Sequence, residues 1–253
     1  MKKTKLTALV VAHNEEAHLP ECLARLGFAD QLVVVLDRCT DKSRDIAKAA
    51  GAKLLEGAWP LEGQRRNAGI AASDGPWILE VDADERVPPA LADEVLAAIE
   101  DAEPGYFLIS FDNYIGQRLV RHGWGAYNGA SAGPRLFTKG AKIWGDQLVH
   151  PRIVLQGQRR RLKTPIDHYV DRDISDLIAR FDRYTRARAM DLSASGDLGT
   201  LPGNIRRIFS RFWKSYVTRR GYREGLYGIL LALFSAAYPL VSYIRARLEG
   251  PGH

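Results

Sequence analysis

Short apolar runs alternate with amphipathic stretches over the first hundred residues of the chain. Four runs predict buried strands, at residues 6–12, 31–36, 53–55 and 77–81. Apolar residues at steps of three and four predict helices after them, over residues 16–26, 41–50, 64–72 and 89–99. Short strands that alternate with helices indicate an α/β fold with a mainly parallel sheet, covered on both faces.

The pattern continues more loosely in the second half. Residues 106–111 and 153–155 predict two further strands, and residues 174–192 predict a long amphipathic helix. Residues 193–203 are rich in glycine and contain Pro202, which is typical of a linker. We therefore predict one domain over residues 1–195 and a C-terminal appendage over residues 196–253.

The appendage is expected to consist of helices that touch a membrane. One apolar stripe is predicted on its first helix, formed by Ile205, Ile208, Phe209, Phe212, Trp213, Tyr216 and Val217. Residues 226–244 then run without a charge for the length of a bilayer's hydrocarbon core, although Pro239 should kink or break a helix there. We expect these helices to lie on or dip into the bilayer surface rather than span it; a buried core helix or a dimer contact is the alternative.

Charge is distributed unevenly along the chain. The net charge is +6, but residues 205–247 alone carry nine basic side chains and one acidic one, which leaves the remainder slightly acidic. A basic segment with an apolar stripe suits an anionic membrane surface better than nucleic acid, so no nucleic-acid partner is expected. The two cysteines, Cys22 and Cys39, indicate neither a disulfide framework nor a zinc site.

Polar residues gather where three of the predicted strands end. His13, Asn14 and Glu15 follow the first strand, residues 37–41 (DRCTD) follow the second, and residues 82–85 (DADE) follow the fourth. Parallel sheets bind ligands at the carboxyl ends of their strands, so these groups are expected to line one cleft. The chain lacks the glycine-rich dinucleotide fingerprint, the phosphate loop and the nucleophile elbow of α/β-hydrolases.

The spacing of Asp82 and Asp84 predicts a binding site for a divalent cation. Side chains at alternate positions of an extended segment share a face, and two carboxylates there repel each other unless a cation lies between them. Oxygen ligands in small number suit Mg²⁺ or Mn²⁺, with substrate phosphates completing the coordination. The alternative is a solvated turn.

Together these motifs resemble the family 2 glycosyltransferases, which have a GT-A fold. The resemblance rests on residues 10–15 (VVAHNE), 37–41 (DRCTD), 63–69 (GQRRNAG) and 79–84 (LEVDAD). A looser resemblance, to the β-glucosyltransferases that build the lipopolysaccharide core, rests on residues 133–137, 148–150 and 165–168 and on the basic, aromatic tail.

The resemblance implies roles for individual residues. It places Ala12, His13, Asn14 and Glu15 at the uridine and ribose, Asp37 on the uracil, Arg66 and Asn67 on the nucleotide side of the donor, Asp82 and Ala83 at the ribose or a metal-bound water, and Asp84 with Asp82 at the metal. Plainer roles stay open for several of them: Asn14 could cap a helix, Arg66 could be a solvated helix residue and His13 a turn residue.

The sequence offers several candidates for the catalytic base. The resemblance to the lipopolysaccharide-core branch implies an acid directly after the histidine that matches His150, but here that position is Pro151. Asp146 is our first candidate and His150 the second, because an imidazole suits proton transfer near neutral pH. Asp167 and His168 rank third.

These expectations define a function. The chain should be an inverting, metal-dependent transferase that moves a sugar, with glucose from UDP-glucose favoured, to a lipid-linked acceptor such as the lipopolysaccharide inner core. It should act at the cytoplasmic face of the inner membrane, as a peripheral or monotopic protein. The alternatives are transfer to a polyprenyl phosphate, nucleotidyl transfer, and a nucleotide-sugar-binding membrane protein without activity.

Overall fold

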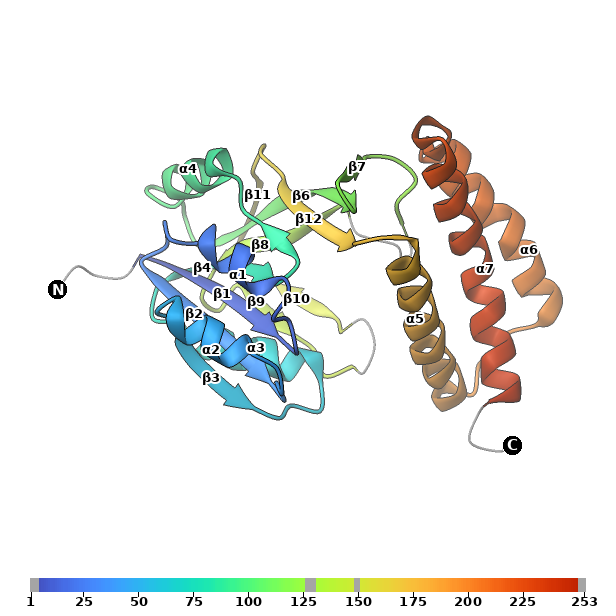
Figure 1. The fold of residues 1–253 in the computed structure, drawn as a ribbon, viewed down its shortest axis with the longest axis horizontal. Helices are drawn as coiled ribbons and strands as arrows, with labels where there is room; N and C mark the ends of the chain where they lie inside the picture. Colours follow the sequence, from blue (N-terminus) through green and yellow to red (C-terminus); the bar gives the residue numbers. More distant parts are fainter. Residues whose placement is uncertain (1–4, 126–130, 148–150, 250–253) are drawn as a thin grey trace. The chain divides into compact units, whose positions relative to one another are not determined.

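The structure, a computed structural model, describes residues 5–125, 131–147 and 151–249. Strands and helices alternate through the first half, and long helices end the chain (Figure 1). The strands are β1 (Leu6–Ala12), β2 (Gln31–Asp37), β3 (Lys53–Gly57), β4 (Trp77–Asp82), β5 (Glu85–Arg86), β6 (Gly105–Ile115), β7 (Arg118–Val120), β8 (Ala132–Thr138), β9 (Lys142–Trp144), β10 (Ile153–Leu155), β11 (Gln158–Arg161) and β12 (Ile166–Asp171). The helices are α1 (Leu19–Ala24), α2 (Ser43–Ala49), α3 (Glu62–Ala72), α4 (Pro89–Ala98), α5 (Ile174–Ser195), α6 (Leu201–Trp213), η2 (Lys214–Thr218), η3 (Gly221–Glu224) and α7 (Leu226–Leu248).

The main sheet is parallel on one side and mixed on the other. Its order is β3-β2-β1-β4-β8-β6-β12-β5; β1 pairs in parallel with β2 and β4, whereas β8 runs antiparallel to both β4 and β6. This mainly parallel sheet with helices on its faces is the GT-A arrangement that the sequence predicted.

Both faces of the parallel part are buried. All seven residues of β1 are buried, and they alternate between two hydrophobic clusters. Leu6, Ala8 and Val10 belong to the cluster that includes residues of α1 and α4, whereas Leu9 and Val11 pack with Ile70 of α3. A continuous apolar run is therefore a strand covered on both sides.

The predicted elements correspond to observed ones, with shifted boundaries. Helix α1 begins only at Leu19, because Pro20 fits the first turn of a helix and residues 16–18 form a turn instead. Strand β6 extends to Ile115, beyond the predicted end. Helix α7 continues through Pro239, so the expected break in the helix is absent.

The chain divides into two compact units. The first comprises Met1–Phe111 and Ala132–His168, and the second comprises Asp112–Ser131 and Tyr169–His253. The boundary that the sequence suggested at residue 195 lies within the second unit, where α5 ends at Gly196 in a left-handed conformation. As a division of function, that boundary stays a prediction.

In the second unit, α7 packs against both α5 and α6 (Figure 1). Among the described residues, α7 is the one helix whose length and apolar composition would allow it to cross a bilayer, and half of its apolar window is buried in the structure. Length and composition alone do not distinguish a core helix from a membrane helix.

Candidate functional site

The carboxyl ends of β1, β2 and β4 meet at one edge of the sheet. Ala12 is in register with Leu36 of β2, and Val11 is in register with Asp82 of β4. The polar segments that follow the three strands therefore belong to one edge, as the sequence predicted. This edge is the candidate active site.

Asp37 is fully buried at the end of β2 and is saturated with hydrogen bonds. Its carboxylate accepts from Arg38 at 2.7 Å and 3.1 Å, from the Trp59 amide at 3.0 Å and from Arg65 at 3.1 Å. Burial favours a higher pKa for Asp37, but the hydrogen bonds from Arg38 and Trp59 outweigh it and hold the pKa below its usual value. A ligand that donates to Asp37 therefore has to displace one of these donors.

The turn after β1 is held against the turn after β2. The ring of His13 hydrogen-bonds through Nδ1 to the Asp37 carbonyl oxygen at 2.6 Å, and Asn14 Oδ1 accepts from the Thr40 amide at 2.7 Å. Asn14 has φ of +56°, a left-handed conformation that asparagine tolerates better than most residues. The identity of Asn14 is thus explained by the turn, and Ala12 lies buried just before it.

The surroundings of Glu15 show that the strand-end edge of the sheet is electronegative. It is partly buried, and its amide donates to Ser43 Oγ at 3.0 Å. Burial, followed by the nearby charges of Asp84, Asp41 and Asp82, raises the pKa of Glu15 to about 7. Several carboxylates without enough positive charge between them form an environment that a cation would stabilise.

A buried network of ion pairs supports the aspartate motif. It contains three acids on or beside β4 and β5 and three bases from α3, β8 and β9: Glu80, Asp82 and Glu85, with Arg66, Arg135 and Lys142. Asp82 accepts from Arg66 at 2.9 Å through one oxygen and from Arg135 at 2.5 Å through the other. Glu80 accepts from Arg66 at 2.5 Å and from Lys142 at 2.8 Å.

The pKa shifts in the network follow from this pairing. Burial favours a higher pKa for Asp82, but Arg135 and Arg66 outweigh it and hold that pKa well below its usual value. Burial raises the pKa of Glu85 to about 7, although Arg135 pulls in the other direction. Burial lowers the pKa of Lys142 to about 8, against the opposing charge of Glu80.

Asp84 differs from Asp82 in its surroundings. Its side chain is about one third exposed, and its Oδ2 lies 3.4 Å from Nε2 of His168. Burial opposes the charged form of His168, but the hydrogen bond and charge of Asp84, with Glu85 and Asp82 nearby, raise its pKa. Strand β12 brings His168 here, because it pairs antiparallel with β5 and sets His168 opposite Glu85.

The side chains at this edge supply only some of the ligands that a divalent cation needs. Within the described ranges, no three histidine, cysteine or acidic side chains come close enough to hold a metal ion. Asp84 and His168 offer one oxygen and one nitrogen, which suits Mn²⁺ or Mg²⁺ when phosphate oxygens and water supply the other ligands. Both oxygens of Asp82 already bind guanidinium groups, so Asp82 fits a supporting role better than that of a ligand.

Two residues predicted to contact the nucleotide also have partners within the protein, and their contact with the donor stays a prediction. Arg66 is buried in the ion network, with its guanidinium 4.7 Å from the Trp144 ring centre. Asn67 donates to the Trp144 carbonyl at 2.8 Å and accepts from its amide at 3.0 Å. Both residues thereby fasten α3 to β9, and no ligand contact is needed to explain them.

The two candidate bases follow β9. Asp146 is exposed, two residues after Trp144, whose indole donates to Glu80 at 3.3 Å. His150 lies outside the described residues. Neither the geometry of Asp146 toward a substrate nor the choice between the two bases follows from these positions, so both assignments stay predictions.

The sequence analysis does not predict the buried pairing of Glu80, Arg135 and Lys142. It considers His168 only as a candidate base, whereas the structure places its ring beside Asp84. Glu80 and Lys142 are charged residues in otherwise apolar strands, and this pattern could have identified them from the sequence. A charged side chain in such a strand is buried only when it is paired with an opposite charge.

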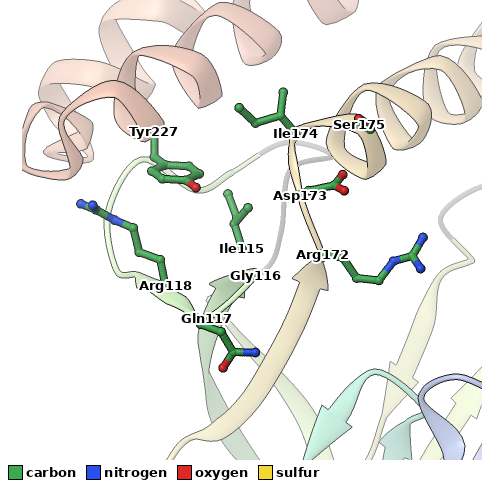
Figure 2. A pocket seen from close by; sticks show the side chains of 9 residues that line it. All are labelled: Ile115, Gly116, Gln117, Arg118, Arg172, Asp173, Ile174, Ser175 and Tyr227. Atoms are coloured by element: carbon green, nitrogen blue, oxygen red, sulfur yellow. The ribbon is translucent and has the colours of Figure 1, made fainter.

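A separate cavity of about 640 Å³ lies in the second unit, near the start of α5 (Figure 2). Its charged groups already have partners. Arg172 binds Asp176 at 2.6 Å, Asp173 caps α5, and the Arg118 guanidinium lies 5.2 Å from the ring centre of Tyr227. The lining residues are Ile115, Gly116, Gln117, Arg118, Arg172, Asp173, Ile174, Ser175 and Tyr227. This cavity lacks the acidic cluster of the strand-end site and is not the candidate active site.

Comparison with known proteins agrees with the geometry. The model of the family "Glycosyl transferase family 2" matches residues 7–154, which include β1 to β4 and the aspartate motif. A crystal structure of residues 1–349 of S. aureus TarS superposes on 97% of this chain and 81% of that chain, with a TM-score of 0.50 and 15% identity. At that identity the likeness shows the fold alone.

Two relatives match over almost the whole chain. The lipopolysaccharide core biosynthesis glycosyltransferase LpsC of Rhizobium meliloti (strain 1021) is 25% identical over 95% of this chain and 91% of its own length. An uncharacterized glycosyltransferase of Rickettsia bellii (strain RML369-C) is 24% identical over 92% of this chain and 82% of its own. From the family match and the strand-end site together, the chain is a glycosyltransferase that belongs to glycosyl transferase family 2.

Proposed function

We propose that this enzyme is an inverting, metal-dependent glycosyltransferase that moves glucose from UDP-glucose to a lipid-linked acceptor of the lipopolysaccharide inner core. The observation that carries the proposal is the electronegative strand-end site, where Glu15, Asp82 and Asp84 gather beside His168. The name of the R. meliloti relative supports the choice of acceptor.

The donor nucleotide would bind along the ends of β1 and β2. Ala12, His13, Asn14 and Glu15 would border the uridine, and Asp37 would accept a hydrogen bond from the uracil. Because the oxygens of Asp37 are fully used, Arg38 would have to release one of them. The side chain of Arg38 is 53% exposed, so it can move into solvent, and the uracil N–H would replace the hydrogen bond that the buried Asp37 loses.

Asp84, together with His168, would hold Mg²⁺ or Mn²⁺ against the diphosphate. When bound, the cation would stabilise the negative charge that develops on the departing UDP. Arg66 and Arg135 hold Asp82 from both sides and would thereby fix the end of β4, with Ala83, at the ribose. In this arrangement the ion network serves to orient the aspartate motif.

The acceptor hydroxyl would lose its proton to Asp146 or His150 as it attacks the anomeric carbon. The oxygen–carbon bond forms on the face opposite the breaking bond to UDP, so the configuration inverts and UDP leaves with the bonding electrons. Asp146 belongs to the exposed loop after β9, which places it outside the buried ion network.

The test is a transfer assay with purified protein. Lipid-linked core acceptor and undecaprenyl phosphate would each be incubated with Mn²⁺ and a panel of UDP-sugars, and the released UDP and the glycolipid product measured. We expect UDP release with the core acceptor and UDP-glucose. Turnover with undecaprenyl phosphate alone would reject the proposal in favour of polyprenyl-phosphate glycosylation. Pyrophosphate release in a parallel reaction with a nucleoside triphosphate and a sugar phosphate would reject it in favour of nucleotidyl transfer.

Replacement of the candidate bases sharpens the assay. Asp146→Asn or His150→Gln should lower kcat by about 10²–10⁴-fold, the usual contribution of general base catalysis, while UDP still binds. Asp101→Asn, at an exposed acid after α4, is the matched control and should leave kcat unchanged. Full activity in both base variants would show that neither residue is the base.

A further inference from the structure

A cavity of about 400 Å³ opens among the helices of the second unit, at the end of α6. It is lined by two serines and three basic residues, from α6, η2, α7 and the turn after η2: Ser210, Arg211, Lys214, Arg219 and Ser235. None of the described lining residues is acidic. The cavity therefore offers guanidinium, ammonium and hydroxyl donors to a ligand, which is the donor set that recognises phosphate.

The charged side chains that act on Arg211 of this cavity are basic, and of these Arg188 is paired with Asp191 at 3.7 Å. Burial lowers the pKa of Arg211, and so do the like charges of Arg207, Arg219 and Arg188. Glu224, the one acid of residues 205–247, is buried and accepts the amides of Arg121 and His122 at 3.0 Å each. Like charges held together without an anion are costly, so an anionic ligand would stabilise the arrangement.

An exposed apolar face lies on the same helix as the cavity. Leu201, Ile205, Phe209 and Trp213 recur every four residues along α6, and the side chains of Phe209 and Trp213 are 73% and 63% exposed. Lys214, which lines the cavity, follows Trp213 directly. Large exposed aromatic residues beside basic ones are typical of helices that lie in a membrane interface.

Helix α7, in contrast, is engaged inside the helical unit. Its Arg245 forms an ion pair with Asp182 of α5, and its Phe234 ring lies 5.0 Å from that of Phe181. Ser235 and Ser242 are buried along its length. Helix α7 is thus partly used for packing, although its Leu226, Leu233 and Leu248 stay exposed. Helix α6 is the one that combines an exposed apolar face with basic residues of the cavity.

We propose that the cavity lined by Arg211, Lys214 and Arg219 binds the phosphate of an anionic phospholipid, while Phe209 and Trp213 enter the boundary of the acyl chains. Complementary charge argues for an anionic lipid as the occupant. This inference goes beyond sugar transfer, because lipid binding by the helical unit needs neither donor nor metal.

The test is vesicle flotation of the full chain without nucleotide. Three vesicle types are compared: phosphatidylcholine alone, phosphatidylcholine with phosphatidylglycerol, and phosphatidylcholine brought to the same surface charge with oleate. We expect the strongest binding to phosphatidylglycerol, about tenfold above oleate, because the cavity recognises phosphate in addition to charge. Equal binding to the two anionic vesicles would overturn the proposal.

Matched variants separate the cavity from diffuse charge. The variant Arg211→Gln, Lys214→Gln, Arg219→Gln should lose the preference for phosphatidylglycerol over oleate. The control Arg206→Gln, Arg220→Gln, Arg223→Gln removes the same charge from positions that do not line the cavity and should retain the preference. If the first variant fails to fold, Lys214→Gln alone serves, since that side chain is exposed. Loss of the preference in both triple variants would show that no specific site exists.

The depth of Trp213 provides an independent measurement. Brominated acyl chains should quench tryptophan fluorescence of the wild-type chain, and Trp213→Phe should remove most of that quenching. If the chain instead self-associates in sedimentation and its fluorescence is not quenched, the face of α6 binds a second copy and the proposal is wrong.

Discussion

At the residue scale, ion pairs and hydrogen bonds within the protein hold the side chains at the strand ends in place without a ligand. Asp37 is held by Arg38 and Arg65, and Asp82 is held by Arg66 and Arg135. The motifs predicted which strand ends carry the site, because the order of strands in a parallel sheet brings those ends together. They could not predict that Arg135 contacts Asp82 or that His168 lies beside Asp84, because these contacts depend on pairing with strands distant in sequence.

The two aspartates of the motif should respond differently to replacement. Asp82→Asn weakens two guanidinium contacts in a buried network and should lower the free energy of unfolding by about 3 kcal/mol. Asp84→Asn affects a partly exposed group and should cost less than about 1 kcal/mol. Urea unfolding of the metal-free protein measures both. Equal losses would contradict the distinct roles assigned to the two residues.

Glu15 should make stability depend on pH. The pKa of Glu15 is about 7 in the folded chain and near 4.5 when unfolded, so its neutral form stabilises the fold below pH 4.5. That contribution is lost as pH rises to about 7, where the ionised group is partly buried among other acids. Because the side chain is partly exposed, we expect a loss on the order of 1 kcal/mol.

Urea unfolding at pH 5 and pH 8 tests this dependence. The wild-type chain should lose more stability between the two pH values than Glu15→Gln, which cannot ionise. Glu100→Gln, at an exposed position after α4, controls for the removal of an acid. The same pH dependence in wild type and Glu15→Gln would contradict the raised pKa.

At the element scale, the strands were predictable and their neighbours in the sheet were not. The apolar runs gave β1, β2 and β4 because buried parallel strands are continuously apolar. Strands β8 and β12 were not predicted, because their residues are mixed in polarity and only partly buried. Helix α7 passes Pro239 intact, which local propensity argued against and packing against α5 and α6 overrides.

The contact between α3 and the loop after β9 depends on a glycine. A Cβ on Gly63 would lie 2.0 Å from the Gly145 carbonyl oxygen, so Gly63→Ala must push that loop away. We expect a loss of about 1–3 kcal/mol in the free energy of unfolding, together with lower transfer activity because Asp146 shifts with the loop. Gly27→Ala, where no atom lies within 4 Å, is the matched control. Equal stability of the two variants would show that the contact is absent.

At the scale of the whole molecule, the surplus of basic side chains and the strand-end site lie in different parts of the chain. Residues 205–247 carry a surplus of basic side chains, whereas the remainder of the chain is slightly acidic and contains the strand-end site. Composition was enough to predict a basic appendage. It could not show which apolar side chains of α6 and α7 are exposed, because that depends on how the helices pack against their neighbours.

This distribution predicts a salt-sensitive association with membranes. About 1 M salt, which shortens the Debye length to about 3 Å, should release most of the protein from isolated membranes, and alkaline carbonate should release the rest. Immunoblots of pellet and supernatant measure the release. Retention in the pellet after both washes would mean that α7 spans the bilayer.

Calorimetric titration of UDP into the protein, with and without Mn²⁺, tests sugar-nucleotide chemistry at the strand ends most directly. We predict at least tenfold tighter UDP binding with Mn²⁺ in the wild-type chain, and loss of that gain in Asp84→Asn while the variant stays folded. UDP affinity that does not change with Mn²⁺, or an Asp84→Asn variant that responds to Mn²⁺ as the wild type does, would contradict it.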